Sequence, residues 1–157
     1  MPSNIQLVLE KMSPDVSNIV ITDDNIDKNN VSSVKGIFTA HSLSMGFTEQ
    51  SSGNMISLSF VLTFSFTIKD KKARNKINQL LLSFNKSVPG IKSYISQQNK
   101  EIYSITFTHE AIFSSENSDN VRTSISNTII PILSYCPLMF SNELTNSKIE
   151  HNNIVRA

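Results

Sequence analysis

Few side chains of this 157-residue chain stand where they could do chemistry, and histidine is the first type to consider. The three histidines are His41, His109 and His151. His109 falls on the apolar parity of its segment, beside Glu110, so it could act as a pH-responsive or catalytic imidazole. We favour a simpler interpretation, a histidine at the core edge satisfied by one hydrogen bond. His151 falls in a polar tail, so three converging imidazoles are not expected.

Cys136 is the only cysteine, so the chain can form neither an internal disulfide nor a cysteine-based zinc cluster. It stands in the stretch Ser134-Tyr135-Cys136-Pro137, on the inner stripe of an expected helix. A cysteine nucleophile needs a nearby base, some exposure and a lowered pKa. Nothing local supplies these, so the sequence predicts a buried, inert thiol.

The carboxylates and glycines give no site signature either. Asp23, Asp24 and Asp27 stand near Asn25 but lack the glycine and terminal glutamate of an EF-hand loop, which favours a solvated acidic loop. The four glycines are isolated, which excludes a glycine-rich phosphate loop; they are Gly36, Gly46, Gly53 and Gly90. We therefore expect no catalytic residue, no cofactor and no metal site, and a protein that is not an enzyme.

One charged cluster stands out after the longest apolar segment. It consists of Lys69, Lys71, Lys72, Arg74 and Lys76. Cations at a helix N-terminus oppose the helix dipole, whereas a phosphate there would meet free N–H groups and the lysines together. The cluster is either a solvated basic turn, which we favour, or a binding site for phosphate or nucleic acid. Exposed aromatic residues for base stacking are not evident.

A long strand must support this cluster. Residues 55–68 alternate apolar and polar side chains, which is typical of a strand with one face in the core. Such a strand belongs to an antiparallel sheet more often than to a parallel one. Gly53-Asn54 supplies a turn before it, and we expect residues 34–49 to be its hairpin partner.

Two helices and a second hairpin follow along the chain. Apolar residues at spacings of three and four predict a helix from Asp70, its cap, to Val88, ended by Pro89-Gly90. Residues 91–97 and 102–113 read as a hairpin around the turn Gln98-Asn99-Lys100. The last helix is expected to begin at Ser118 or Asp119, to kink or start late at Pro131, and to close at Pro137.

The N-terminal third is less defined. Residues 5–12 fit a short helix and a strand equally well, and Pro14 would end either element. Residues 19–21 suggest a short strand, and we expect 22–30 to form an acidic loop. The fold class is therefore α+β, a two-layer domain whose antiparallel sheet carries helices on one face, in the order (α)(β)ββαββα. We expect a single domain over 1–141 and a polar, frayed tail over 142–157.

Composition limits the compartment and the partner. The net charge of +1 gives no global field toward nucleic acid or an anionic membrane. The start, Met1-Pro2-Ser3-Asn4, lacks the features of a signal peptide, and no apolar run approaches the roughly 20 residues of a membrane helix. We expect a cytoplasmic protein without membrane contact.

Part of the pattern resembles a known family. Five segments carry the resemblance. They are the strand ending in Phe64-Ser65-Phe66, the helix beginning Ala73-Arg74-Asn75, the stretch Phe84-Asn85-Lys86, the hairpin over 91–113 and the closing helix through Leu133. From 55 to about 140 the chain resembles the YbjN-like proteins, which are similar in fold to type III secretion chaperones. This resemblance implies the order αβββαββα and a homodimer that offers grooves and sheet edges to another protein. It assigns no functional residue.

The leading functional hypothesis is a non-enzymatic protein-binding module, chaperone-like or adaptor-like and homodimeric. The first alternative is a nucleic-acid or phosphate binder that uses the cluster at 69–76. A further alternative is an immunity or anti-defence inhibitor protein that binds a partner protein.

Overall fold

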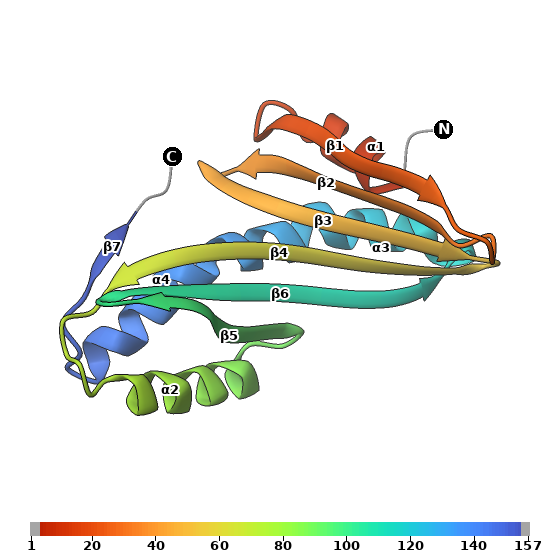
Figure 1. The fold of residues 1–157 in the computed structure, drawn as a ribbon. Helices are drawn as coiled ribbons and strands as arrows, with labels where there is room; N and C mark the ends of the chain where they lie inside the picture. The colour runs from red at the N-terminus through yellow and green to blue at the C-terminus, as the bar shows by residue number, and fades with distance from the viewer. Residues whose placement is uncertain (1–3, 155–157) are drawn as a thin grey trace. The chain divides into compact units, whose positions relative to one another are not determined.

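The computed structural model describes residues 4–154 and has the expected α+β class (Figure 1). Helices pack on a seven-stranded antiparallel sheet whose strand order is β1-β2-β3-β4-β6-β5, with β7 paired to β4. The elements are α1 (Asn4–Lys11), β1 (Val16–Ile26), β2 (Ser32–Ala40), β3 (Leu43–Ser52), β4 (Met55–Thr67), α2 (Arg74–Ser87), β5 (Ile91–Asn99), β6 (Ile102–Ser114), the 3₁₀ turn η1 (Ser115–Asn117), α3 (Ser118–Ser124), the π-helix η2 (Ile125–Ile129), α4 (Ile130–Asn146) and β7 (Asn152–Ile154). No helix among the described residues is both long and apolar enough to cross a membrane.

The described residues divide into two compact units. Unit 1 comprises residues 4–62 and 109–134, and unit 2 comprises residues 63–108 and 135–154. β4, β6 and α4 each contribute residues to both units. The expectation of a single domain over 1–141 stays a prediction.

Unit 1 is built on the meander of β1, β2, β3 and the first part of β4. Alternate side chains of these strands form the core, because successive residues of a strand point to opposite faces. The buried apolar side chains are Val16, Val34, Phe38, Ala40, Met45, Phe47, Ile56, Leu58, Phe60 and Leu62. α1 buries Ile5 and Leu9 and contacts β1. The Ile5 N–H donates to Oε2 of the buried Glu49 at 3.2 Å, so a β3 carboxylate satisfies one of the first amides of this helix.

Three expectations for unit 1 need comment. Of the two alternatives for residues 5–12, the structure has the helix. Residues 34–49 are not one strand, because His41 and Ser42 both adopt positive φ and make a two-residue turn between β2 and β3. The acidic loop expected over 22–30 is partly wrong, since β1 pairs with β2 as far as Ile26.

Unit 2 holds α2 against β5, with Ile77, Leu81 and Phe84 buried. The helix ends where expected, before Pro89-Gly90, but Asp70 is not its cap. Asp70 Oδ1 instead accepts the Lys72 N–H at 2.9 Å in the preceding turn, and Ala73 stands at the N-cap. The β5–β6 hairpin is confirmed, with Lys100 at positive φ in the turn and Gln98 and Asn99 within β5.

The C-terminal part differs most from expectation. Pro137 does not close the last helix, since α4 continues to Asn146. The expected frayed tail over 142–157 is wrong for the described residues 142–154, because Leu144 and Ile149 are buried and β7 pairs with β4. Residues 155–157 lie outside the described residues. Of the two alternatives expected at Pro131, a late helix start is wrong, because α3, η2 and α4 follow one another without a break from Ser118. The π-helical turn η2 ends two residues before Pro131, and a kink there stays a prediction.

Candidate functional site

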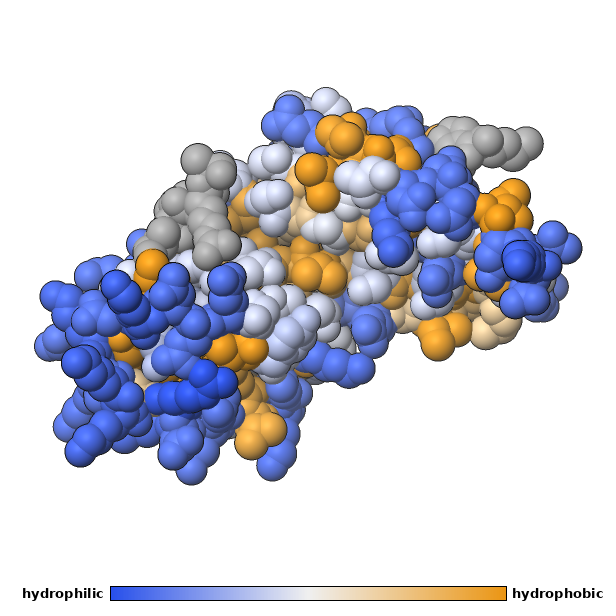
Figure 2. Space-filling model, viewed as in Figure 1, coloured by the Kyte–Doolittle hydropathy of each residue, from blue (hydrophilic) through white to orange (hydrophobic). Residues whose placement is uncertain are grey.

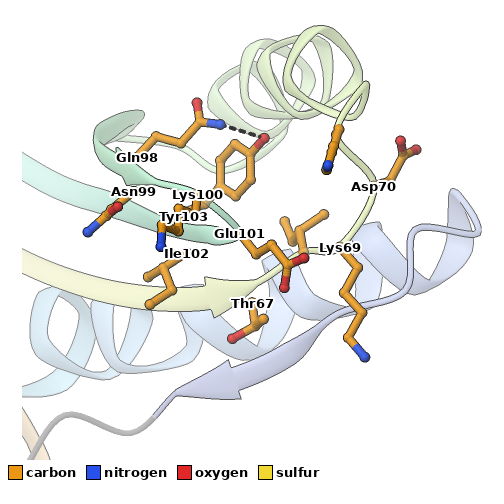
Figure 3. A pocket seen from close by; sticks show the side chains of 11 residues that line it. Thr67, Lys69, Asp70, Gln98, Asn99, Lys100, Glu101, Ile102 and Tyr103 are labelled. Atoms are coloured by element: carbon orange, nitrogen blue, oxygen red, sulfur yellow. Dashed lines mark hydrogen bonds between the residues drawn. The ribbon is translucent and has the colours of Figure 1, made fainter.

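The predicted basic cluster lies on unit 2 at the connection between β4 and α2. All five of its side chains are exposed. Lys69 and Lys71 line a groove of about 790 Å³ together with residues of the β5–β6 turn (Figure 3). We call this the basic groove; it is lined by Thr67, Ile68, Lys69, Asp70, Lys71, Gln98, Asn99, Lys100, Glu101, Ile102 and Tyr103. Lys72, Arg74 and Lys76 lie outside its described lining.

Hydrogen bonds fix the walls of the basic groove. The Ile68 N–H donates to the Glu101 carbonyl at 2.7 Å, which ties the β4–α2 connection to the hairpin turn. Gln98 Nε2 donates to the Tyr103 hydroxyl at 2.9 Å (Figure 3), and Arg74 donates to Gln98 Oε1. Arg74 is therefore engaged with the wall, whereas the lysine side chains Lys69 and Lys100 are exposed along the rim.

A second groove of about 520 Å³ shares Thr67 and Lys69 with the basic groove. Its other side comes from the C-terminal segment and includes Lys148, Glu150 and His151. His151 is not in a frayed tail as expected: its Nε2 lies 2.6 Å from Ser141 Oγ, its Nδ1 lies 3.0 Å from the Ile149 carbonyl oxygen, and its ring packs against Phe66. Lys69 thus stands where two grooves adjoin.

Charge is strongly segregated between the two units. The segments 63–108 and 135–157 carry ten Lys and Arg against four Asp and Glu, whereas 1–62 and 109–134 carry four against nine. Unit 2 is therefore basic and unit 1 acidic, although the whole chain has a net charge of only +1. A field of this kind attracts charged partners and directs which unit they approach.

Unit 1 presents a row of apolar side chains on the sheet face opposite its core. Val20 of β1 pairs with Ile37 of β2, Ile37 pairs with Gly46 of β3, and Gly46 pairs with Val61 of β4. We call Val20, Ile37 and Val61 the apolar row. Val20 is 50% exposed and Ile37 is 46% exposed. Figure 2 shows hydrophobic surface where β1 and β2 lie in Figure 1.

His109 is half-buried on the part of β6 that belongs to unit 1. Burial lowers the pKa of its imidazole below the ordinary value of 6.5. Its Nδ1 is buried and has no hydrogen-bond partner within residues 4–154, and the interpretation of a histidine satisfied by one hydrogen bond stays a prediction.

The pKa of His109 predicts a pH effect on stability. Because the folded-state pKa is below 6.5, the unfolded chain binds the proton more readily, and stability falls as the pH drops from about 7.5 through 6.5 toward the folded-state value. Urea unfolding of the wild type and of His109→Gln over pH 5 to 8 measures this. In His109→Gln the free energy of unfolding should depend less steeply on pH than in the wild type. The control His41→Asn, which replaces an exposed histidine, should keep the wild-type pH dependence. Equal slopes in all three proteins would contradict the assignment.

The remaining candidates show no arrangement for catalysis. Cys136 is buried, and burial raises the pKa of its thiol to about 12, so the thiol stays protonated at neutral pH. Within the described part of the chain, no group of three or more His, Cys, Asp or Glu side chains could hold a metal ion. Asp23 accepts a hydrogen bond from Asn25 Nδ2, and Asp27 accepts the N–H groups of Asn29 and Val31.

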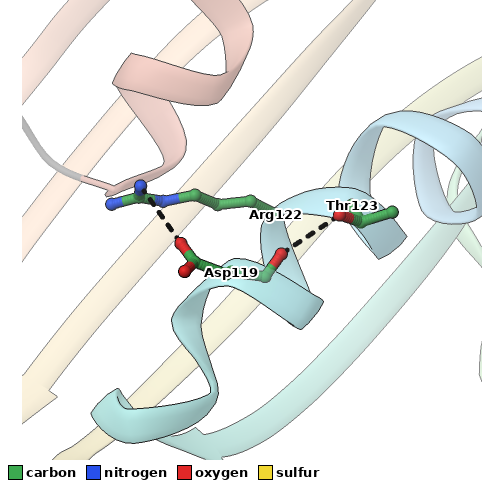
Figure 4. A network of polar contacts seen from close by, with 3 residues as sticks. All are labelled: Asp119, Arg122 and Thr123. Carbon is green, nitrogen blue, oxygen red and sulfur yellow. Dashed lines mark hydrogen bonds and ion pairs between the residues drawn. The ribbon is translucent and has the colours of Figure 1, made fainter.

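A smaller pocket of about 310 Å³ lies between α1 and α3 in unit 1. Its polar lining includes Lys11, Arg122 and Thr123. Arg122 Nη1 lies 3.7 Å from Asp119 Oδ1, and Thr123 Oγ1 donates to the Asp119 carbonyl at 3.2 Å (Figure 4). Both contacts lie within α3, so neither joins α3 to the rest of this pocket.

Several of these residues were not found from the sequence. Lys100 and Lys148 are distant from the cluster in sequence and join its surroundings only through the hairpin turn and the C-terminal segment. The apolar row required the register of four strands. That register depends on the turn at His41-Ser42, which the sequence does not mark with glycine or proline.

No protein-family model, no curated protein and no solved structure matches this chain. The resemblance to YbjN-like proteins stays a prediction.

Proposed function

We propose that the protein is a non-enzymatic binding module that holds another protein against the apolar row of unit 1. The observation that supports this is the cross-strand pair of Val20 and Ile37, each about half exposed on the sheet face away from the core. Fully burying one such side chain contributes about 1.5–3 kcal/mol. A partner that covers the row would gain a substantial part of its binding free energy from these two side chains.

The surroundings of the row suggest the chemistry of the partner. Asp23 pairs with Lys35 across β1 and β2, two positions from Ile37, so charges of both signs flank the row. Unit 1 as a whole is acidic, with nine Asp and Glu against four Lys and Arg in its segments. A partner segment with apolar side chains at its centre and Lys or Arg at its rim is complementary to this surface.

Features of the edge strands favour binding at the sheet face over strand addition at an edge. The register of β1 on β2 shifts at two places, between Ser17 and Val20 and between Ile21 and Asp23. In unit 2, the Asn85 side chain of α2 bonds both the N–H and the carbonyl of Ser93 in β5. Bulges and side chains that occupy edge groups are common protections against strand pairing.

The matched variants Ile37→Asp and Leu82→Asp test the proposal. Both replace an exposed apolar residue by a carboxylate, but Leu82, 63% exposed, lies on α2 of unit 2. Proteins captured from the native host lysate are compared between the wild type and both variants, and the affinity of a captured partner is then measured with purified proteins. We expect Ile37→Asp to weaken binding at least tenfold, about 1.4 kcal/mol, and Leu82→Asp to leave it unchanged.

Two outcomes would contradict the proposal. One is a failure of the test in its first form: the captured partner binds Ile37→Asp as tightly as the wild type, or the wild type captures no partner protein. The other is a dimer in light scattering that dissociates in Ile37→Asp, because a second copy of the chain would then occupy the row. Thermal unfolding of each variant checks that the fold is retained.

A further inference from the structure

We infer that unit 2 carries a second binding site, which holds single-stranded RNA along the basic groove and the second groove. The site is separate from the apolar row, all of whose residues belong to unit 1. Its cations come from three segments: Lys69 and Lys71 from the β4–α2 connection, Lys100 from the hairpin turn, and Lys148 from the segment before β7. In a solvated basic turn the cations would all come from one segment. Here cations from three segments line one pair of adjoining grooves.

The two grooves suit an extended ligand better than a free phosphate. They share Thr67 and Lys69, and their volumes are about 790 and 520 Å³. Each lies in the range of sites that bind molecules of nucleotide size or larger. Because the grooves share these two residues, a linear polyanion could enter both, with Lys100 in one lining, Lys148 in the other and Lys69 in both.

The carboxylates in the grooves favour RNA over an acidic polypeptide. Asp70 and Glu101 line the basic groove and Glu150 lines the second groove, in the same linings as the lysines. In Figure 3 the Glu101 carboxylate and the Lys69 side chain extend from neighbouring segments, which the hydrogen bond from the Ile68 N–H to the Glu101 carbonyl joins. A polypeptide rich in Asp and Glu would place its charges beside these carboxylates. An RNA strand alternates phosphates with riboses, whose 2′-hydroxyls can donate to a carboxylate.

The groups that meet the bases determine specificity. Asn99 offers an amide group, whereas both ends of the Gln98 amide are engaged with Tyr103 and Arg74, and Ile102 is an exposed apolar residue in the same lining. Tyr103 is buried and holds its hydroxyl against Gln98, so it cannot stack on a base. The lining therefore supports binding with little sequence preference, governed mainly by phosphate contacts.

Binding of fluorescein-labelled oligo(rU), oligo(dU) and poly-glutamate, all of matched length, tests the inference by anisotropy. We expect oligo(rU) to bind with an affinity that falls on adding salt, with a slope of about −3 in log K against log salt if four lysines each neutralise one phosphate. The double variant Lys69→Glu/Lys100→Glu should weaken binding at least tenfold at 50 mM salt. The double control Lys86→Glu/Lys76→Glu makes the same change of charge outside the grooves and should cost less than threefold, and the single control Lys86→Glu should cost no more than the double control.

The same experiment includes the overturning results. Equal loss in the groove variant and in its double control would mean a diffuse charge effect, which overturns the site. Tighter binding of poly-glutamate than of oligo(rU) would assign the grooves to an acidic polypeptide instead. Absence of oligo(rU) binding at low salt would also overturn the inference.

Glu101→Gln provides a readout that a general charge effect cannot mimic. Oligo(rU) and oligo(dU) differ only in the 2′-hydroxyl, so the ratio of their affinities reports contacts to the ribose. We expect the wild type to prefer oligo(rU) and Glu101→Gln to lower that preference, although the variant makes the groove more basic. A preference unchanged by the substitution would contradict the role of the carboxylate.

Discussion

Replacement of Gly36 by alanine is expected to destabilise the protein by about 3 kcal/mol, at the upper end of the overpacking range. A Cβ at Gly36 would lie 2.6 Å from Phe47 Cζ, 2.7 Å from Phe47 Cε1 and 2.7 Å from the Val20 carbonyl oxygen. Gly36 and Phe47 are directly paired across β2 and β3, and the Phe47 ring is buried. The carbonyl belongs to the backbone of the neighbouring strand β1, so the clash is not relieved by a side-chain rotation alone.

Gly46 provides the matched control, because it belongs to the same pair of strands but lies on the opposite sheet face, between Ile37 and Val61. A Cβ at Gly46 would meet only the Gly36 carbonyl oxygen, at 3.8 Å, which is an ordinary contact. We expect Gly46→Ala to leave stability unchanged or to raise it by up to about 1 kcal/mol, since alanine restricts the unfolded chain. Urea unfolding monitored by circular dichroism measures both variants. A Gly36→Ala protein as stable as Gly46→Ala would contradict the register of β2 and β3.

Phe140→Ala is the second substitution with a large expected effect, a loss of about 3–5 kcal/mol. Phe140 of α4 is fully buried in unit 2. Its ring centroid lies 5.7 Å from that of Phe66, 6.0 Å from that of Phe84 and 6.3 Å from that of Phe107. These rings come from β4, α2 and β6, so truncation leaves a cavity where four elements meet.

Leu138→Ala is the control for Phe140. Leu138 lies two residues earlier on α4 and is 56% exposed, so its truncation should change the free energy of unfolding by no more than about 0.5 kcal/mol. Denaturant unfolding of both variants gives the comparison. A loss below 1 kcal/mol for Phe140→Ala would mean that α4 does not pack in unit 2 as described, and that the continuation of this helix past Pro137 is wrong.

The elements with strong periodicity were predictable from the sequence. The alternation in residues 55–68 and the spacing of Ile77, Leu81 and Phe84 indicated β4 and α2, because each pattern buries one face of one element. The β5–β6 hairpin was predictable for the same reason. The α+β class followed from these elements alone.

The errors have physical causes. His41 and Ser42 form their turn with positive φ and without glycine or proline, so the break between β2 and β3 carried no composition signal. Pro137 remains inside α4, because burial of Phe140 and Leu144 beyond it outweighs the local cost of the missing N–H. Burial of Ile149 and the pairing of β7 likewise order a segment whose polar composition suggested a frayed tail.

The candidate sites were predictable only in part. The cluster at 69–76 was visible because its charges are adjacent in sequence, and two of its members line the basic groove. Lys100 and Lys148 reach these grooves through tertiary structure. The charge segregation was hidden because the segments of the two units alternate along the chain, so that an acidic and a basic unit sum to a net charge of +1.

Site-specific photo-cross-linking tests the central proposal, that the apolar row of unit 1 holds another protein, most directly. A photoreactive amino acid is placed at Ile37, and in a control protein at Leu82, and each is irradiated in native host lysate after nuclease treatment. The proposal predicts a discrete protein adduct from position 37 that is absent from position 82 and is lost when Val20→Asp is added. Adducts that are identical from both positions, or an adduct at position 37 that persists with Val20→Asp, would contradict it.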